Sequence, residues 1–221
     1  MKKDVIICIG TVGSPTFNKC FSIAKSIMKS NSNVKKIEVI ENYSPQCAWL
    51  NEMIKRAQGY TWCIQLDEDM YLKENTIKKM LNEAREVESK GVGVGLVHGL
   101  LWDIFLDQEI GSLKLWRTKI LKKFEFEDIL GSDRKVVTSM KKKGYKIVKI
   151  NETLGHHDSA PTIEIGKKKY YEYVHKIRKF DGEEKALRFI NSLKANNKNK
   201  EIIKSAEQAL DSEILNKSKK I

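Results

Sequence analysis

Two aspartates separated by a single residue form the sharpest chemical feature of this 221-residue sequence. Asp67 and Asp69 follow residues 62–66, an apolar run typical of a buried β-strand. Alternate side chains of an extended chain point the same way, so the two carboxylates are expected to share a face. Such a pair suits a hard divalent cation, Mg²⁺ or Mn²⁺, whose coordination substrate phosphates complete. The alternative is a solvated acidic turn after a strand.

The elements that would position this pair alternate as β-α-β-α-β-α through the first 90 residues. Strands are expected at 5–10, 34–40 and 60–66, and helices at 16–30, 46–57 and 73–90. This alternation predicts a parallel sheet with helices on its faces. Ligands of such sheets bind beyond the carboxyl ends of the strands. The loops that begin at Gly10, Glu41 and Asp67 should therefore meet at one polar, acidic edge.

The second half of the chain is less regular. It predicts a glycine-interrupted strand at 91–97, a short strand or turn at 113–120, a helix at 133–144, a strand at 145–150 and a polar turn at 155–158. After Pro161, charged helices are expected at 165–180, 183–195 and 199–217. We therefore divide the chain into a catalytic domain at 1–160, with halves at 1–90 and 91–160, and a basic helical extension at 161–221.

The stretch from Val5 to Met80 resembles the nucleotide-sugar-binding half of a GT-A-fold glycosyltransferase of the family-2-like kind. Four features carry the resemblance: the apolar strand and polar loop of Val5–Thr16, a second strand that ends at Glu41 or Asn42, Asn51 in the helix before the acidic strand, and the DxD motif within Gln65–Met70. The order and spacing of these motifs extend it over residues 4–158. It implies a Rossmann-like, mostly parallel α/β sheet with a C-terminal helical extension.

The resemblance also implies an activity, a cofactor and a set of site residues. The activity is metal-dependent transfer of a sugar from a nucleotide-diphosphate sugar to a hydroxyl of a glycan or lipid-linked glycan, with inversion, as in polysaccharide biosynthesis. Mn²⁺ or Mg²⁺ would be bound by Asp67, Asp69 and His157, although the residues alone do not choose between His156 and His157. Nucleotide-sugar contacts are implied for Thr11, Gly13, Glu41, Asn42, Asn51, Asp67 and Arg117.

A carboxylate at the start of a helix would be the catalytic base. Asp133 has the spacing that the resemblance implies, eleven residues before Gly144. Asp128, in the acidic pair Glu127-Asp128, is the alternative base. Asp133 could instead cap the helix that follows it.

The formal charge of +12 narrows the class of partner. Residues 160–221 hold 15 basic and nine acidic side chains, so half of the net charge falls on the last 62 residues. Basic proteins bind nucleic acid, anionic membranes or phosphorylated substrates. No nucleic-acid partner is expected, because carboxylates gather at the ligand edge and no nucleic-acid-binding motif is present. The basic, aromatic segment 167–179 could contact an anionic membrane near a lipid-linked acceptor; the alternative is a solvated face of packed helices.

Two other classes of protein stay open. One is a non-catalytic basic protein that binds nucleic acid or a sugar nucleotide. The other is a metal-dependent nucleotidyl- or phosphotransferase. The lack of Arg or Lys between Gly10 and Asn18 disfavours a sugar nucleotidyltransferase, and Tyr71, two residues after the DxD motif, disfavours a haloacid-dehalogenase-type phosphatase. No apolar run approaches the ~18 residues that a membrane span needs, and the first residues have the pattern of a strand and not of a signal peptide. No CxxC motif is present. We therefore expect a cytoplasmic protein with reduced thiols, or one that is peripheral to the inner membrane face.

Overall fold

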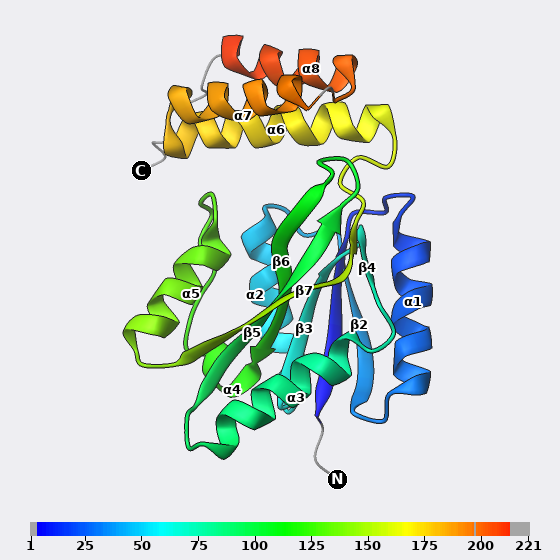
Figure 1. Cartoon of the computed structure of the whole chain (residues 1–221), viewed down its shortest axis with the longest axis vertical. Coiled ribbons are helices and arrows are strands. Elements are labelled where there is room, and N and C mark those ends of the chain that lie inside the picture. The colour runs from blue at the N-terminus through cyan, green and yellow to red at the C-terminus, as the bar shows by residue number, and fades with distance from the viewer. Residues whose placement is uncertain (1–3, 197, 213–221) are drawn as a thin grey trace. The chain divides into compact units, whose positions relative to one another are not determined.

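The computed structural model describes residues 4–196 and 198–212 (Figure 1). It divides into two compact units with the boundary after Asp158. In the first unit the elements are β1 (Val5–Thr11), α1 (Phe17–Ser30), β2 (Val34–Glu41), α2 (Gln46–Arg56), β3 (Trp62–Asp67), β4 (Met70–Leu72), α3 (Thr76–Ser89), β5 (Val94–Asp103), β6 (Gln108–Arg117), α4 (Thr118–Leu121), α5 (Ser132–Lys142) and β7 (Lys146–His157). The predicted alternation over the first 90 residues is confirmed, and only the short β4 was not predicted there.

One seven-stranded sheet organises this unit, with the strand order β2-β1-β3-β6-β5-β7-β4. β1 is parallel to β2 and β3, and β5 is parallel to β7. β6 is antiparallel to both of its neighbours, and β4 is antiparallel to β7. The predicted α/β class with C-terminal helices is therefore confirmed, with a sheet that is mixed.

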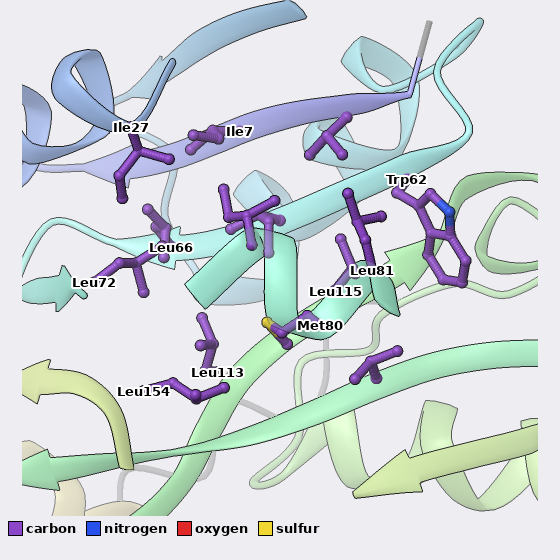
Figure 2. Packing of buried hydrophobic residues seen from close by; sticks show 14 of the residues in the cluster. Ile7, Ile27, Trp62, Leu66, Leu72, Met80, Leu81, Leu113, Leu115 and Leu154 are labelled. Atoms are coloured by element: carbon purple, nitrogen blue, oxygen red, sulfur yellow. The ribbon is translucent and has the colours of Figure 1, made fainter. Parts of the chain in front are cut away.

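Two cores lie on opposite faces of the sheet. Residues Val5–Ile9 of β1 are completely buried, because β1 is covered on both sides. On one face, Ile7 and Leu66 pack with Ile27 of α1 and Met80 of α3, as Figure 2 shows. The other core joins the sheet to α2, α4 and α5. All four cysteines are free, and three of them are buried.

The sequence predictions for the second half were too short. β5 and β6 form a long hairpin where shorter elements were expected, and β7 continues to His157 instead of ending at 150. The predicted polar turn at 155–158 is therefore wrong, since three of its four residues lie in β7. The cause is an irregularity in the β5–β7 pairing. Between two successive pairs, β5 advances two residues, from His98 to Leu100, while β7 advances four, from Lys149 to Thr153. The exposed residues of that bulge hide the strand pattern.

The second unit contains three helices, α6 (Ile163–Asp181), α7 (Glu183–Ala195) and α8 (Lys200–Asp211). They pack against one another through buried residues that include Val174, Ile190 and Ala206. The three helices are confirmed, and α8 ends at Asp211 within the predicted range of 199–217. The part of that range beyond residue 212 lies outside the described residues.

Candidate active site

The parallel register of β1, β2 and β3 brings three loops to one edge of the sheet. Thr11 pairs with Glu41, and Gly10 pairs with Asp67, each at the carboxyl end of its strand. Asn42 donates its backbone N–H to the carbonyl of Thr11 at 2.9 Å. The predicted meeting of these loops is confirmed. Of the predicted nucleotide-sugar residues, Thr11, Gly13, Glu41, Asn42 and Asp67 belong to this edge.

Glu68, between the two aspartates, holds the loop that follows β1. Its buried carboxylate accepts the hydroxyl of Thr11 and the backbone N–H groups of Val12 and Ser14, the last two at 3.2 and 2.9 Å. Gly13 completes the loop with a φ of +82°, a conformation that other residues rarely adopt. No role is predicted for Glu68 from the sequence, although its side chain should point to the face opposite to Asp67 and Asp69, and this alternation was the available signal.

Asp69 lies next to His157 and, through it, to Asp103. His157 Nε2 is 3.3 Å from Asp69 Oδ1, and His157 Nδ1 is 2.6 Å from Asp103 Oδ2. The antiparallel pairing of β4 with β7 sets this approach. Gly155 permits the close pairing, because a Cβ atom there would lie 2.3 Å from the carbonyl oxygen of Tyr71. The structure thus brings His157, rather than His156, to the acidic motif.

The spacing of Asp69 and His157 fits a divalent cation. Two adjacent ligands of an octahedral ion at ~2.1 Å lie roughly 3 Å apart, close to the 3.3 Å between His157 Nε2 and Asp69 Oδ1. Over residues 4–196 and 198–212, no three His, Cys, Asp or Glu side chains form a metal-binding group. The donor set therefore fits a cation whose remaining ligands come from substrate and water, and does not fit a closed protein cage.

The electrostatics of this edge are strongly negative. Burial, together with the charges of Asp69, Asp67 and Glu68, raises the pKa of the Cys20 thiol to about 12. Three carboxylates thus act on one buried group. A negative potential of this kind favours a bound cation.

Asp133, the predicted base, lies in the first turn of α5 and pairs with a buried lysine. Lys114 Nζ lies 2.8 Å from Asp133 Oδ2, and the lysine side chain is 7% exposed. Burial acts to raise the pKa of Asp133, but the charge and hydrogen bond of Lys114 outweigh it and lower that pKa. Lys114 pairs with Gln65 of β3, which shares a strand face with Asp67 two residues later.

Asn51 and Arg117, two other predicted residues, have different partners. Asn51 holds the backbone of Phe126 at both N–H and carbonyl, at 2.9 and 2.8 Å. Arg117 pairs with Trp62 at the amino end of β3, roughly 17 Å along the strand from Asp67 at ~3.3 Å per residue. Asp128 is exposed in the segment before α5, and its charge acts on Cys47 in the first turn of α2, next to the loop that follows β2.

Comparisons with known proteins show which solved structures share this fold. No protein-family model matches the chain, and no curated protein matches its sequence. The mannosyltransferase PcManGT from Pyrobaculum calidifontis, solved with GDP-Man and Mn²⁺, is 12% identical with a TM-score of 0.58, over 96% of this chain and 75% of that chain. TarS of S. aureus is 12% identical with a TM-score of 0.56, over 94% of this chain and 50% of that chain. A197 from STIV is 13% identical with a TM-score of 0.51, over 70% and 85%.

These likenesses show a GT-A-type fold, as in glycosyltransferases, and confirm the resemblance at that level. At 12–13% identity they do not identify an activity or a substrate for this chain.

The buried ion pair yields a stability prediction. Replacing Lys114 with Met leaves a largely buried Asp133 carboxylate unpaired, so unfolding free energy at neutral pH should fall by roughly 1–3 kcal/mol. Because the folded pKa of Asp133 is lowered, the pair stabilises above the unfolded pKa of ~3.9 and loses this effect as pH falls through the folded pKa. Urea unfolding of both proteins should show a difference that narrows in acid.

Lys135→Met is the matched control, since its ion pair with Glu127 is about half exposed on both sides. Its loss should be below ~1 kcal/mol. An equal loss for Lys114→Met at neutral and acid pH would contradict the assigned role of the pair.

Proposed function

We propose that the first unit is a metal-dependent glycosyltransferase. It would move a sugar from a nucleotide-diphosphate sugar to a hydroxyl of a glycan or lipid-linked acceptor, with inversion at the anomeric carbon. The observation that carries the proposal is the Asp69–His157 pair at the carboxyl edge of a GT-A-type sheet, beside the loop held by Glu68. The fold is shared with PcManGT, whose complex with GDP-Man and Mn²⁺ supports the same class of ligand.

The donor side of the proposal uses the loops at this edge. The loop of Thr11 and Gly13 is held in one shape by Glu68, so it offers a fixed surface to the nucleotide. Glu41 and Asn42 are exposed beside it and can bind polar groups of the nucleoside. A Mn²⁺ or Mg²⁺ ion held by Asp69 and His157, with Asp67, would stabilise the negative charge of the departing diphosphate.

The acceptor side uses Asp133. A hydroxyl must lose its proton as it attacks, and a carboxylate within hydrogen-bond reach can accept it. The lowered pKa of Asp133 keeps it ionised at neutral pH, which this role requires. Lys114 would orient the carboxylate and leave Oδ1, which accepts from Arg134 N at 2.8 Å, on its other side.

The second unit is proposed to contact an anionic membrane. None of the described helices is long and apolar enough to cross a bilayer. Large apolar side chains are nevertheless exposed on α6 and α7, at Ile163, Tyr173, Phe180 and Leu187. Exposed lysines accompany them on α6, at 168, 176 and 179. Apolar and basic side chains together are typical of surfaces that bind anionic lipid.

Nucleotide binding tests the donor side. Thermal unfolding would be followed with UDP, GDP, CDP, ADP and dTDP, each with Mn²⁺, Mg²⁺ or EDTA. We expect one nucleotide to stabilise the protein in a metal-dependent way, by ~2.7 kcal/mol at about 100 times its Kd. Asp69→Asn should lose this stabilisation, because a cation ligand is gone.

Asp107→Asn serves as the control for charge, since Asp107 is exposed and its φ of 56° suits asparagine equally. The donor proposal fails if no nucleotide shifts the melting temperature of the wild-type protein, or if Asp69→Asn keeps the full shift.

The two candidate bases can be separated by turnover. With the nucleotide sugar that binds, Asp133→Asn should lower kcat about 10²- to 10⁴-fold, the usual contribution of a general base. Asp128→Asn should keep most of the activity if Asp133 is the base, and the reverse result would move the role to Asp128. Nucleotide binding without turnover in the wild-type protein would favour a sugar-nucleotide-binding protein.

Vesicle binding tests the second unit. Co-sedimentation with phosphatidylserine-containing vesicles should fall at high salt, because the attraction is screened. The variant Lys168→Glu/Lys176→Glu/Lys179→Glu should lose at least about 100-fold in partitioning, at ~1 kcal/mol per lysine. The variant Lys78→Glu/Lys119→Glu/Lys142→Glu changes the net charge equally in the first unit. Equal loss in both variants would argue against a specific membrane surface.

A further inference from the structure

Asp103 is a buried carboxylate at the end of β5, and the donor proposal does not use it. It is 1% exposed. Its Oδ1 accepts the backbone N–H of Leu106 at 2.7 Å, in the turn that follows β5. Its Oδ2 lies 2.6 Å from His157 Nδ1. The two oxygens therefore hold two different elements, the β5–β6 turn and β7.

The short contact decides which ring nitrogen of His157 carries the proton. An ionised carboxylate can only accept hydrogen bonds, so at 2.6 Å the imidazole must donate from Nδ1. At the other nitrogen, the 3.3 Å between Nε2 and Asp69 Oδ1 is longer than an ordinary N–H···O bond. With one ring proton, His157 therefore presents the Nε2 lone pair toward Asp69.

We propose that Asp103 is a positioning residue, which fixes the tautomer and ring orientation of His157 so that Nε2 faces Asp69 as a ready ligand. The tautomer follows from the Asp103–His157 geometry alone. The consequence for cation binding rests on the proposed function, since it takes Nε2 and Asp69 to bind the same ion. A carboxylate that orients a histidine ligand in this way also raises its basicity.

Asp103→Asn is a specific test, because both carboxylate oxygens of Asp103 accept hydrogen bonds, whereas the amide of asparagine has only one oxygen that can accept. If the amide oxygen keeps the hydrogen bond from Leu106 N, the amide N–H₂ faces His157 Nδ1 and forces the ring proton to Nε2. If the amide turned over, its oxygen would keep the bond from His157 Nδ1, but its N–H₂ would face the N–H of Leu106, donor against donor. The first arrangement is therefore the one expected. Either arrangement keeps the size of the side chain.

The first measurement is the tautomer of His157, read from long-range ¹H–¹⁵N NMR spectra. The spectra would be taken at the alkaline end of the histidine titration, where one ring proton remains, and assigned with His157→Gln. His98 is an internal reference of the opposite kind, since its Nε2 lies 2.7 Å from the carbonyl of Gly111 and must donate. We expect the proton at Nδ1 of His157 in the wild-type protein and at Nε2 in Asp103→Asn.

The second measurement is Mn²⁺ affinity, followed by the electron paramagnetic resonance of free Mn²⁺, with the metal alone and with added GDP. Asp103→Asn should bind Mn²⁺ about 10- to 100-fold more weakly than wild type, the usual effect of losing such a partner. Asp107→Asn removes a carboxylate from the same turn and should bind as wild type does. Urea unfolding would show that both variants fold.

The outcomes separate the two proposals. If the wild-type protein binds no Mn²⁺ with or without GDP, the metal-dependent function fails, and the spectra still decide the tautomer. If wild type binds Mn²⁺ but neutral His157 carries its proton at Nε2, or if Asp103→Asn leaves the tautomer and the affinity unchanged, the role of Asp103 is overturned.

Discussion

The hydrogen bonds of Glu68 to the β1 loop are the interaction on which the rest of the site depends. They join the end of β3 to the end of β1, so the loop of Thr11 and the acidic motif take one shape together. Glu68 can reach this loop because β1 and β3 are parallel and in register to their carboxyl ends. One residue on, Asp69 ends the turn that leads into β4 and lies beside His157. The buried carboxylate of Glu68 thus lies between the two partly buried carboxylates of the candidate site, Asp67 and Asp69.

The burial of β1 on both faces explains why only one register of β1 with β2 and β3 is stable. Its side chains are enclosed on both faces, so a slip along β2 or β3 would move apolar groups out of two cores at once. Such a slip would lower the stability of the whole unit, and it would also move the side chains at the carboxyl ends of the strands out of place. This is why the loops that carry polar side chains can be short and still be placed accurately.

The sequence predicted the part of the site that local pattern determines. Asp67 and Asp69 follow an apolar strand at a predictable edge, and periodicity alone locates β1, β2 and β3 there. It could not locate Asp103 beside His157, because that contact joins residues 54 positions apart across a bulged pairing of β5 with β7. Nor could it see that Asn51 and Arg117 lie in other surroundings, since a polar residue on a helix or strand shows no partner in sequence. Long-range pairing, and not propensity, decided these cases.

The charges of the site are arranged as two separate systems. Asp133 has its counter-ion in Lys114, which lowers its pKa and holds it in place. Burial raises the pKa of Cys20, and the charges of Asp69, Asp67 and Glu68 add to that rise, so their combined negative charge acts on a buried neighbour. Pairing keeps the Asp133 carboxylate ionised and oriented toward an attacking hydroxyl, whereas a concentrated negative charge is suited to a cation that arrives with an anionic substrate. Because the described protein groups supply only part of a coordination shell, binding of cation and diphosphate would be coupled, each completing the site of the other.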